Sequence, residues 1–121
     1  MKITMKQFIV CAAIAGALSV NVASAHAHLH LSVPANRSVV AVAPQQMTLE
    51  FNEPVQLTAM TIQKGDGPAT KLGPLPDAAA KQFTLAVTVV EAGNYIVKWR
   101  AVSSDGHIVA DKVLFTIEPA K

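Results

Sequence analysis

Proline placement is the feature that most limits how this 121-residue chain can fold. All seven prolines lie between positions 34 and 119, at 34, 44, 54, 68, 74, 76 and 119. Proline removes a backbone donor and breaks the interior of a helix, and the sequence shows no amphipathic helical pattern of ordinary length around these positions. Apolar and polar residues instead alternate with the period of two that marks a half-buried β-strand. The chain is therefore expected to be all-β.

This alternation predicts strands over residues 29–33, 47–51, 83–89, 95–102 and 113–117. In the first of them, Leu29, Leu31 and Val33 share the apolar face. The spacing of strands and turns predicts an antiparallel sandwich. Residues 63–81 are rich in glycine and proline and show little alternation, so they are expected to form a hairpin tip and an irregular loop.

The aromatic residues beyond position 26 all fall within strand patterns and are assigned to the core. Trp99 is expected near its centre. Met47 and Met60 lie in no methionine-rich run and are also assigned to the core. The aromatic core residues are Phe51, Phe83, Tyr95, Trp99 and Phe115.

Residues 1–25 are predicted to be a cleaved secretory signal peptide. Lys2 and Lys6 precede the apolar run FIVCAAIAGALSV, and Ala23-Ser24-Ala25 forms a cleavage site with small residues at both ends. The run is shorter than the roughly 20 residues needed to cross a bilayer, so the mature chain is not expected to insert into a membrane. Cys11 does not follow a small residue, which argues against lipidation.

Cleavage after Ala25 would leave residues 26–121, which is enough for one domain in the periplasm. Loss of Lys2 and Lys6 leaves eight basic and eight acidic side chains, which is no footprint for nucleic-acid binding. Cleavage also removes Cys11, the chain's one cysteine, so neither a disulfide nor a thiolate metal ligand is expected. We expect a monomer.

Histidine is concentrated at two places in this expected mature chain. His26, His28 and His30 fall within five positions at its start, where cleavage would give His26 a free α-amine beside its imidazole. His107 follows Asp105 by two residues in AVSSDGH, a spacing that directs both side chains to one side of an extended or bulged segment. Ser-Asp-Gly is also an ordinary turn sequence, so at this point the segment is either a turn or a ligand pair.

If the first strand lies beside this segment, the α-amine, three imidazoles and a carboxylate would form a nitrogen and oxygen metal site. Such donors favour Cu(II) over nickel and zinc, whereas Cu(I) prefers cysteine and methionine. An α-amine has a pKa of about 7.7 to 8.0 and histidine one of about 6.5, so copper can displace their protons near neutrality and acid should release it. The candidate metal ligands are His26, His28, Asp105 and His107.

A local chelate is the competing interpretation of the N-terminal histidines. His26-Ala27-His28 can bind Cu(II) in a square plane through the amine, deprotonated backbone amides and the His28 imidazole, without any folded domain. Only Asp105 and His107 distinguish the two sites. His30 has no partner suggested by the sequence and is taken to face solvent.

The motifs along the chain resemble those of the CopC family of periplasmic copper-binding proteins. The resemblance rests on HAHL at 26–29, S-x-P-A at 32–35, L-x-F-x-E at 49–53, GNYIVKWRAVSSDGH at 93–107 and F-x-I at 115–117. It implies an immunoglobulin-like Greek-key β-sandwich of about seven strands. It also implies that the first and third mature residues and the D-x-H motif bind Cu(II). Those positions are His26, His28, Asp105 and His107.

The resemblance further implies a role in copper resistance or homeostasis beside a polytopic inner-membrane copper transport protein of the CopD type. Some family members carry a Met/His-rich loop for Cu(I), and this sequence has no counterpart of it. The chain departs from the family pattern at Asn52, where Ser or Thr is usual, and at Asp111, where Gly is common. These departures affect local geometry, and Asp111 is expected to disturb the last turn.

Three classes of function are compatible with these features. The first is a periplasmic protein that carries or sequesters one Cu(II) ion and is not an enzyme. The second is a copper mono-oxygenase with a histidine brace, which would need a substrate-binding face that the core assignment of the aromatic residues does not leave. The third is a sandwich interaction module that binds no metal.

Overall fold

The computed structural model describes residues 27–89 and 91–120, which form seven β-strands and no helix. No helix able to span a membrane is found in this part of the chain. The predicted signal peptide and His26 lie outside the described residues. The strands are β1 (Leu29–Val33), β2 (Ser38–Val40), β3 (Gln46–Lys64), β4 (Ala69–Lys71), β5 (Ala80–Ala86), β6 (Gly93–Ser103) and β7 (Ile108–Ile117).

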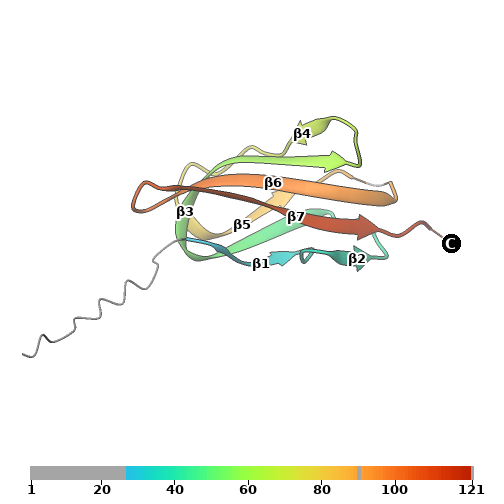
Figure 1. Ribbon diagram of the computed structural model, residues 1–121, viewed down its shortest axis with the longest axis horizontal. Helices are drawn as coiled ribbons and strands as arrows, with labels where there is room; N and C mark the ends of the chain where they lie inside the picture. Colours follow the sequence, from blue (N-terminus) through green and yellow to red (C-terminus); the bar gives the residue numbers. More distant parts are fainter. Residues whose placement is uncertain (1–26, 90, 121) are drawn as a thin grey trace, which may run out of the picture.

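Strand β3 is 19 residues long and belongs to both layers of the sandwich. Its residues 46–51 pair with β1 and β5, while residues 55–64 pair with β6 and, near their end, with β4. Pro54 lies between these two parts, where the register with β5 shifts, because proline has no N–H to give to a ladder. Figure 1 shows β3 bending and crossing from one layer to the other.

The sheet runs in the order β1-β3-β6-β7-β2, and its pairs are antiparallel with one exception. Strand β2 pairs in parallel with β7, from Ser38 opposite Phe115 to Val40 opposite Ile117. The predicted antiparallel sandwich is therefore confirmed, with this one parallel pair at its edge. The reason for the parallel pair is that β1 and β2 follow one another along the same side of the molecule (Figure 1). The first of them pairs with β3 and the second with β7.

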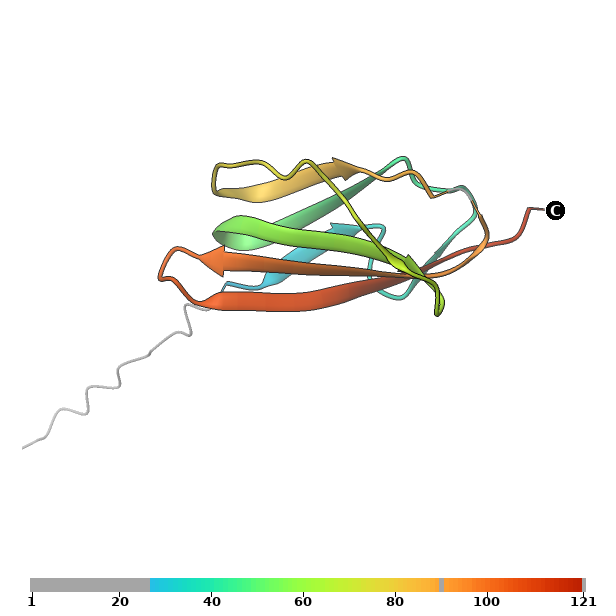
Figure 2. The same ribbon diagram turned by 90° about the horizontal axis from the view of Figure 1, so that it is seen from above.

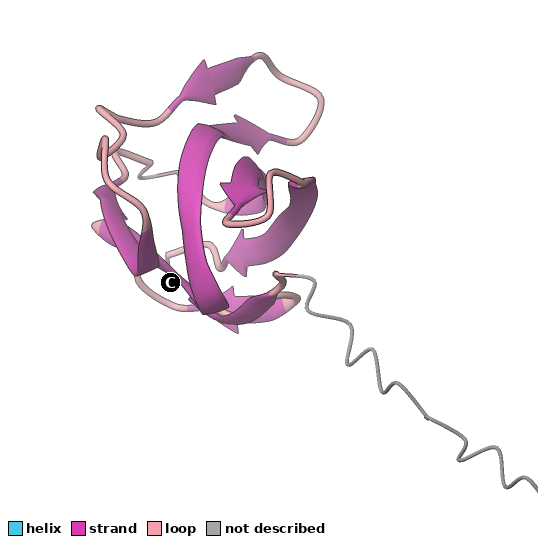
Figure 3. Ribbon diagram, turned by 90° about the vertical axis from the view of Figure 1, so that its left-hand side faces the viewer, coloured by secondary structure: helices cyan, strands magenta, loops and turns pink. Residues whose placement is uncertain are grey.

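The core confirms the assignment made from the aromatic residues. Trp99 packs edge-on against Phe51, with ring centroids 5.0 Å apart, and Phe51 packs in the same way against Phe83 at 6.1 Å. Tyr95 stacks on Phe115 at 5.4 Å. All five rings are buried, as are Met47 and Met60. Figure 3 looks along the strands and shows them arranged as two layers that face one another.

Strand β1 departs from the predicted alternation. Ser32 is buried, whereas 48% of Leu31 and 57% of Val33 is exposed. Leu29 pairs with Phe51 and Leu31 with Glu50, so the strand gains one residue at His30. A bulge of this kind reverses which face each later side chain occupies.

The Gly- and Pro-rich segment forms the predicted hairpin tip and irregular loop, and it also contains the short strand β4. A turn with Gly65 at φ +52° leads into β4, which pairs with residues 61–63 of β3 before the irregular stretch begins. All three residues of β4 are exposed, so no alternation indicates the strand. The expectation that Asp111 disturbs the last turn was wrong, because this residue lies inside β7 opposite Trp99 and not in a turn.

Candidate metal centre

Residues Ser103 to His107 make the tight turn between β6 and β7. The Gly106 N–H donates to the Ser103 carbonyl at 2.9 Å, and the Ser103 N–H donates to the His107 carbonyl at 2.9 Å. Gly106 has a φ of +88°, which a residue with a side chain rarely adopts. The turn that Ser-Asp-Gly predicted is therefore present, and it fixes the two side chains on either side of Gly106.

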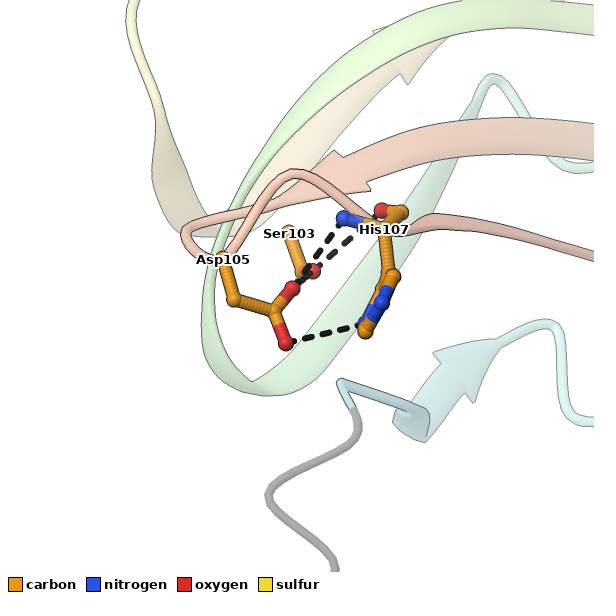
Figure 4. A network of polar contacts seen from close by, with 3 residues as sticks. All are labelled: Ser103, Asp105 and His107. Atoms are coloured by element: carbon orange, nitrogen blue, oxygen red, sulfur yellow. Dashed lines mark hydrogen bonds and ion pairs between the residues drawn. The ribbon is translucent and has the colours of Figure 1, made fainter.

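Asp105 and His107 form a pair on this turn (Figure 4). Oδ2 of Asp105 lies 3.0 Å from Nδ1 of His107, and the His107 backbone N–H donates to Oδ1 at 3.1 Å. The Ser103 hydroxyl also donates to Oδ1 in a short hydrogen bond. The pair faces solvent, with 67% of the His107 side chain and 47% of the Asp105 side chain exposed.

These hydrogen bonds favour the charged form of the Asp105 carboxylate. The Ser103 hydroxyl, and after it the His107 backbone N–H, lower the pKa of Asp105 below its ordinary value. A carboxylate beside Nδ1 favours a proton on that nitrogen, which leaves the lone pair on Nε2. Metal-binding histidines are commonly oriented by a carboxylate in this way.

Ser103 is a part of the site that the sequence interpretation missed. It is only 5% exposed, although it is polar and ends its strand. The inward-facing positions of β6 are 95, 97, 99 and 101, and position 103 continues that series. A serine at an inward position next to a D-x-H motif was the signal available, because a buried hydroxyl needs a partner.

The chain at the start of β1 is held through the backbone of His28. The His28 N–H donates to Oδ1 of Asn52 at 2.7 Å, and the Asn52 N–H donates to the His28 carbonyl at 3.2 Å. Ala27 is 4% exposed and belongs to the core, whereas His28 and His30 are exposed. Asn52, one of the two departures from the family pattern, thus holds the backbone of a candidate ligand.

The start of β1 and the β6–β7 turn lie at the same end of the sandwich. Figures 1 and 2, which differ by a quarter turn, both place the first described residues beside this turn, and Figure 4 shows them below the Asp105–His107 pair. The adjacency that a joint site requires is thus present in the fold. Within residues 27–89 and 91–120, no three His, Cys, Asp or Glu side chains form a group that could hold a metal ion. His26 lies outside these ranges.

This geometry defines a class of protein: a small all-β sandwich that carries an Asp-x-His pair at the end where its first strand begins. The family model of the CopC domain matches residues 29–118, so the chain belongs to the CopC family. The family resemblance of the motifs is thereby confirmed.

Individual relatives agree with this assignment. The chain is 35% identical to copper resistance protein C of Escherichia coli over 110 residues, which cover 79% of this chain and 84% of the relative. It is also 35% identical over 100 residues to protein YobA of E. coli K12, covering 78% and 80%.

Among solved structures, CopC from Methylosinus trichosporium OB3b matches with a TM-score of 0.68 and 30% identity, over 79% of this chain and 97% of that one. The methionine-rich copper resistance protein PcoC of E. coli matches with a TM-score of 0.56 and 31% identity, over 78% and 100%.

Proposed function

We propose that this chain is a periplasmic Cu(II)-binding protein of copper resistance or homeostasis. Membership of the CopC family implies a copper-related function. In this proposal residues 1–25 direct secretion and are removed, and the mature monomer carries or sequesters one Cu(II) ion next to an inner-membrane transport protein of the CopD type. The ion is its cargo and undergoes no turnover. The proposed ligands are His26, His28, Asp105 and His107.

The observation that carries the proposal is the hydrogen-bonded pair of Asp105 and His107 beside the start of β1. The 3.0 Å contact with Nδ1 presents Nε2 of His107 as the ligand atom. The chain enters β1 next to this pair, so a ligand set drawn from both regions needs no rearrangement of the sandwich (Figure 4). Asp105 also orients His107 through this contact.

The donor types favour divalent copper. Imidazole, amine and carboxylate are ligands of Cu(II), whereas Cu(I) prefers sulfur. Met47 and Met60 are 1% and 2% exposed and fill the core, so neither presents its sulfur to a surface ion. Residues 26–121 contain no cysteine. A binding role is also favoured over the mono-oxygenase role, because every aromatic ring between residues 27 and 120 is buried and so unavailable to stack on a polysaccharide.

The test is a competitive Cu(II) titration of the protein beginning at His26, with electron paramagnetic resonance (EPR) spectra of the bound ion. His107→Ala is expected to weaken binding by at least about tenfold and to change the spectrum, because a direct ligand is lost. His30→Ala is the matched control, since His30 is an exposed histidine of β1 outside the proposed ligand set. It should leave both affinity and spectrum unchanged.

Equal binding by His107→Ala and the unsubstituted protein would overturn the joint site. The ion would then be held by His26-Ala27-His28 alone, and the segment 103–107 would be only a turn. A melting temperature that does not rise with Cu(II) would favour the metal-free interaction module instead, because a ligand that binds the folded state stabilises it.

A further inference from the structure

The backbone of His28 decides which of two Cu(II) complexes the N-terminus can form. In the local chelate the ion takes the His26 α-amine, the amide nitrogens of Ala27 and His28, and the His28 imidazole, and each amide nitrogen exchanges its proton for the metal. In the joint site the amides keep their protons and only side chains and the α-amine bind. The two complexes therefore make opposite demands on the His28 N–H.

In the structure this N–H is already engaged. It donates to Oδ1 of Asn52 at 2.7 Å, and the Asn52 N–H donates back to the His28 carbonyl at 3.2 Å. A His28 nitrogen without its proton would face the lone pairs of that oxygen. Turning the amide toward the ion would break both hydrogen bonds and draw Ala27, which is 4% exposed, out of the core.

The position of Asn52 in β3 makes this contact firm. Asn52 follows Phe51, whose ring is buried against Trp99 and Phe83, and it precedes Pro54, where β3 leaves the layer of β1. The two hydrogen bonds to His28 extend the β1–β3 ladder beyond the pair of Leu29 and Phe51. The side chain of Asn52 takes the place of the backbone acceptor that a longer strand would supply.

We infer that Asn52 determines the mode of copper binding: by holding the His28 N–H it denies Cu(II) the local chelate and leaves the His28 imidazole for the joint site with His107. This inference rests on the proposed function. Asn52 acts through His28 and is a positioning residue. The role also gives a physical meaning to the departure from the Ser or Thr that is usual at this position.

The test compares three proteins that begin at His26 and all carry His107→Ala, which weakens the joint site and lets the two modes compete. The first has no further change, the second adds Asn52→Ala and the third adds Asn52→Asp. Aspartate keeps an acceptor oxygen at the same reach, so it is the matched control for the loss of the amide. The negative charge of aspartate affects the affinity of both copper complexes, so the ratio of the two complexes is the quantity that is compared.

Each protein receives one equivalent of Cu(II) at the same neutral pH, and EPR with visible absorption gives the fraction in the planar four-nitrogen form. This form absorbs at shorter wavelength, because amide nitrogens are strong-field ligands. The ratio of local to side-chain complex is expected to be about fivefold higher with Asn52→Ala than with Asn52→Asp, as befits one lost hydrogen bond. Near-ultraviolet circular dichroism of the buried Trp99 checks that the core is the same in all three.

Equal ratios in the alanine and aspartate variants would overturn the role of Asn52 alone. The proposed function would be unaffected, because it is decided by comparing His107→Ala with the unsubstituted protein. A four-nitrogen planar spectrum in the unsubstituted protein would overturn both, since the His28 N–H would then not be withheld from the ion.

Discussion

The β6–β7 turn and the start of β1 lie at the same end of the sandwich, but they are held by different kinds of contact. In the turn, Asp105 is hydrogen-bonded to Ser103 and His107, each two residues away. At the start of β1, His28 is held by Asn52, which is 24 residues away in the sequence. The contacts of the turn are therefore local in sequence, whereas the position of His28 depends on the completed fold.

This difference matters for how a metal site can be assembled. The turn orients His107 as soon as β6 and β7 pair, so this half is organised before copper arrives. The other half requires the ladder of β1 on β3 and, in the proposed function, the cut after Ala25 that frees an α-amine. Changes that act on one half and spare the other should separate their contributions.

One added glycine between Ala25 and His26 should have the largest effect. It moves the α-amine away from the His26 imidazole and leaves the turn intact. We expect the Cu(II) affinity of the secreted protein to fall by at least about a hundredfold, more than is usual when only an outer partner of a ligand is lost. Competition with a chelator of known affinity measures this, and denaturant unfolding without copper is expected to be the same for both proteins. An unchanged affinity would mean that the amine is no ligand and that the turn dominates the site.

Ser103→Ala should have a smaller effect, because it loosens the turn without removing a ligand. Loss of the hydroxyl removes the largest cause of the lowered pKa of Asp105, so that pKa should rise toward its ordinary value of 3.8. Cu(II) affinity should fall by about tenfold, as for other losses of an outer hydrogen bond. Carboxyl NMR titration and chelator competition measure the two effects, with the exposed neighbour Ser104→Ala as control. If both serine variants behave alike, His107 is oriented without help from Ser103.

The same contrast explains how much of the site the sequence could predict. The pairing of Asp105 with His107 followed from their spacing around Gly106, because the contacts involved are local. Asn52 could not be found in this way, since its partner is defined only once β1 lies on β3. Ser103 lies between these cases: its inward position continues the alternation of β6, but its bond to Asp105 depends on the geometry of the turn.

The fold was predictable to a similar extent. Alternation and aromatic content located part of each core strand, because burial of one face imposes a period of two. Residues 55–64 of β3 and 108–112 of β7 were not predicted as strand. Alternation failed in β1, where the bulge at His30 turns Leu31 and Val33 outward. It also gave no sign of β2 or β4, because each has only three residues and none of these residues is fully buried. Short edge strands form because a neighbouring strand is available for pairing, and not because their own sequence alternates between apolar and polar residues.

The smallest expected effect is on stability in acid, and it sharpens the description of the turn. The pKa of Asp105 is lower in the folded protein than its ordinary 3.8, so the charged carboxylate contributes stability that is fully present above pH 3.8 and is lost as the pH falls through the folded value.

Asp105→Asn keeps the shape of the side chain and removes its charge. In copper-free denaturant titrations, the unsubstituted protein should therefore be more stable than Asp105→Asn at pH 6, and this gap should close as the pH falls below 3.8. The gap should be small, because the carboxylate is exposed and screened by water. A gap that stays constant across this range would mean that the bonds from Ser103 and His107 do not favour the charged form, and the turn would then orient His107 by its shape alone.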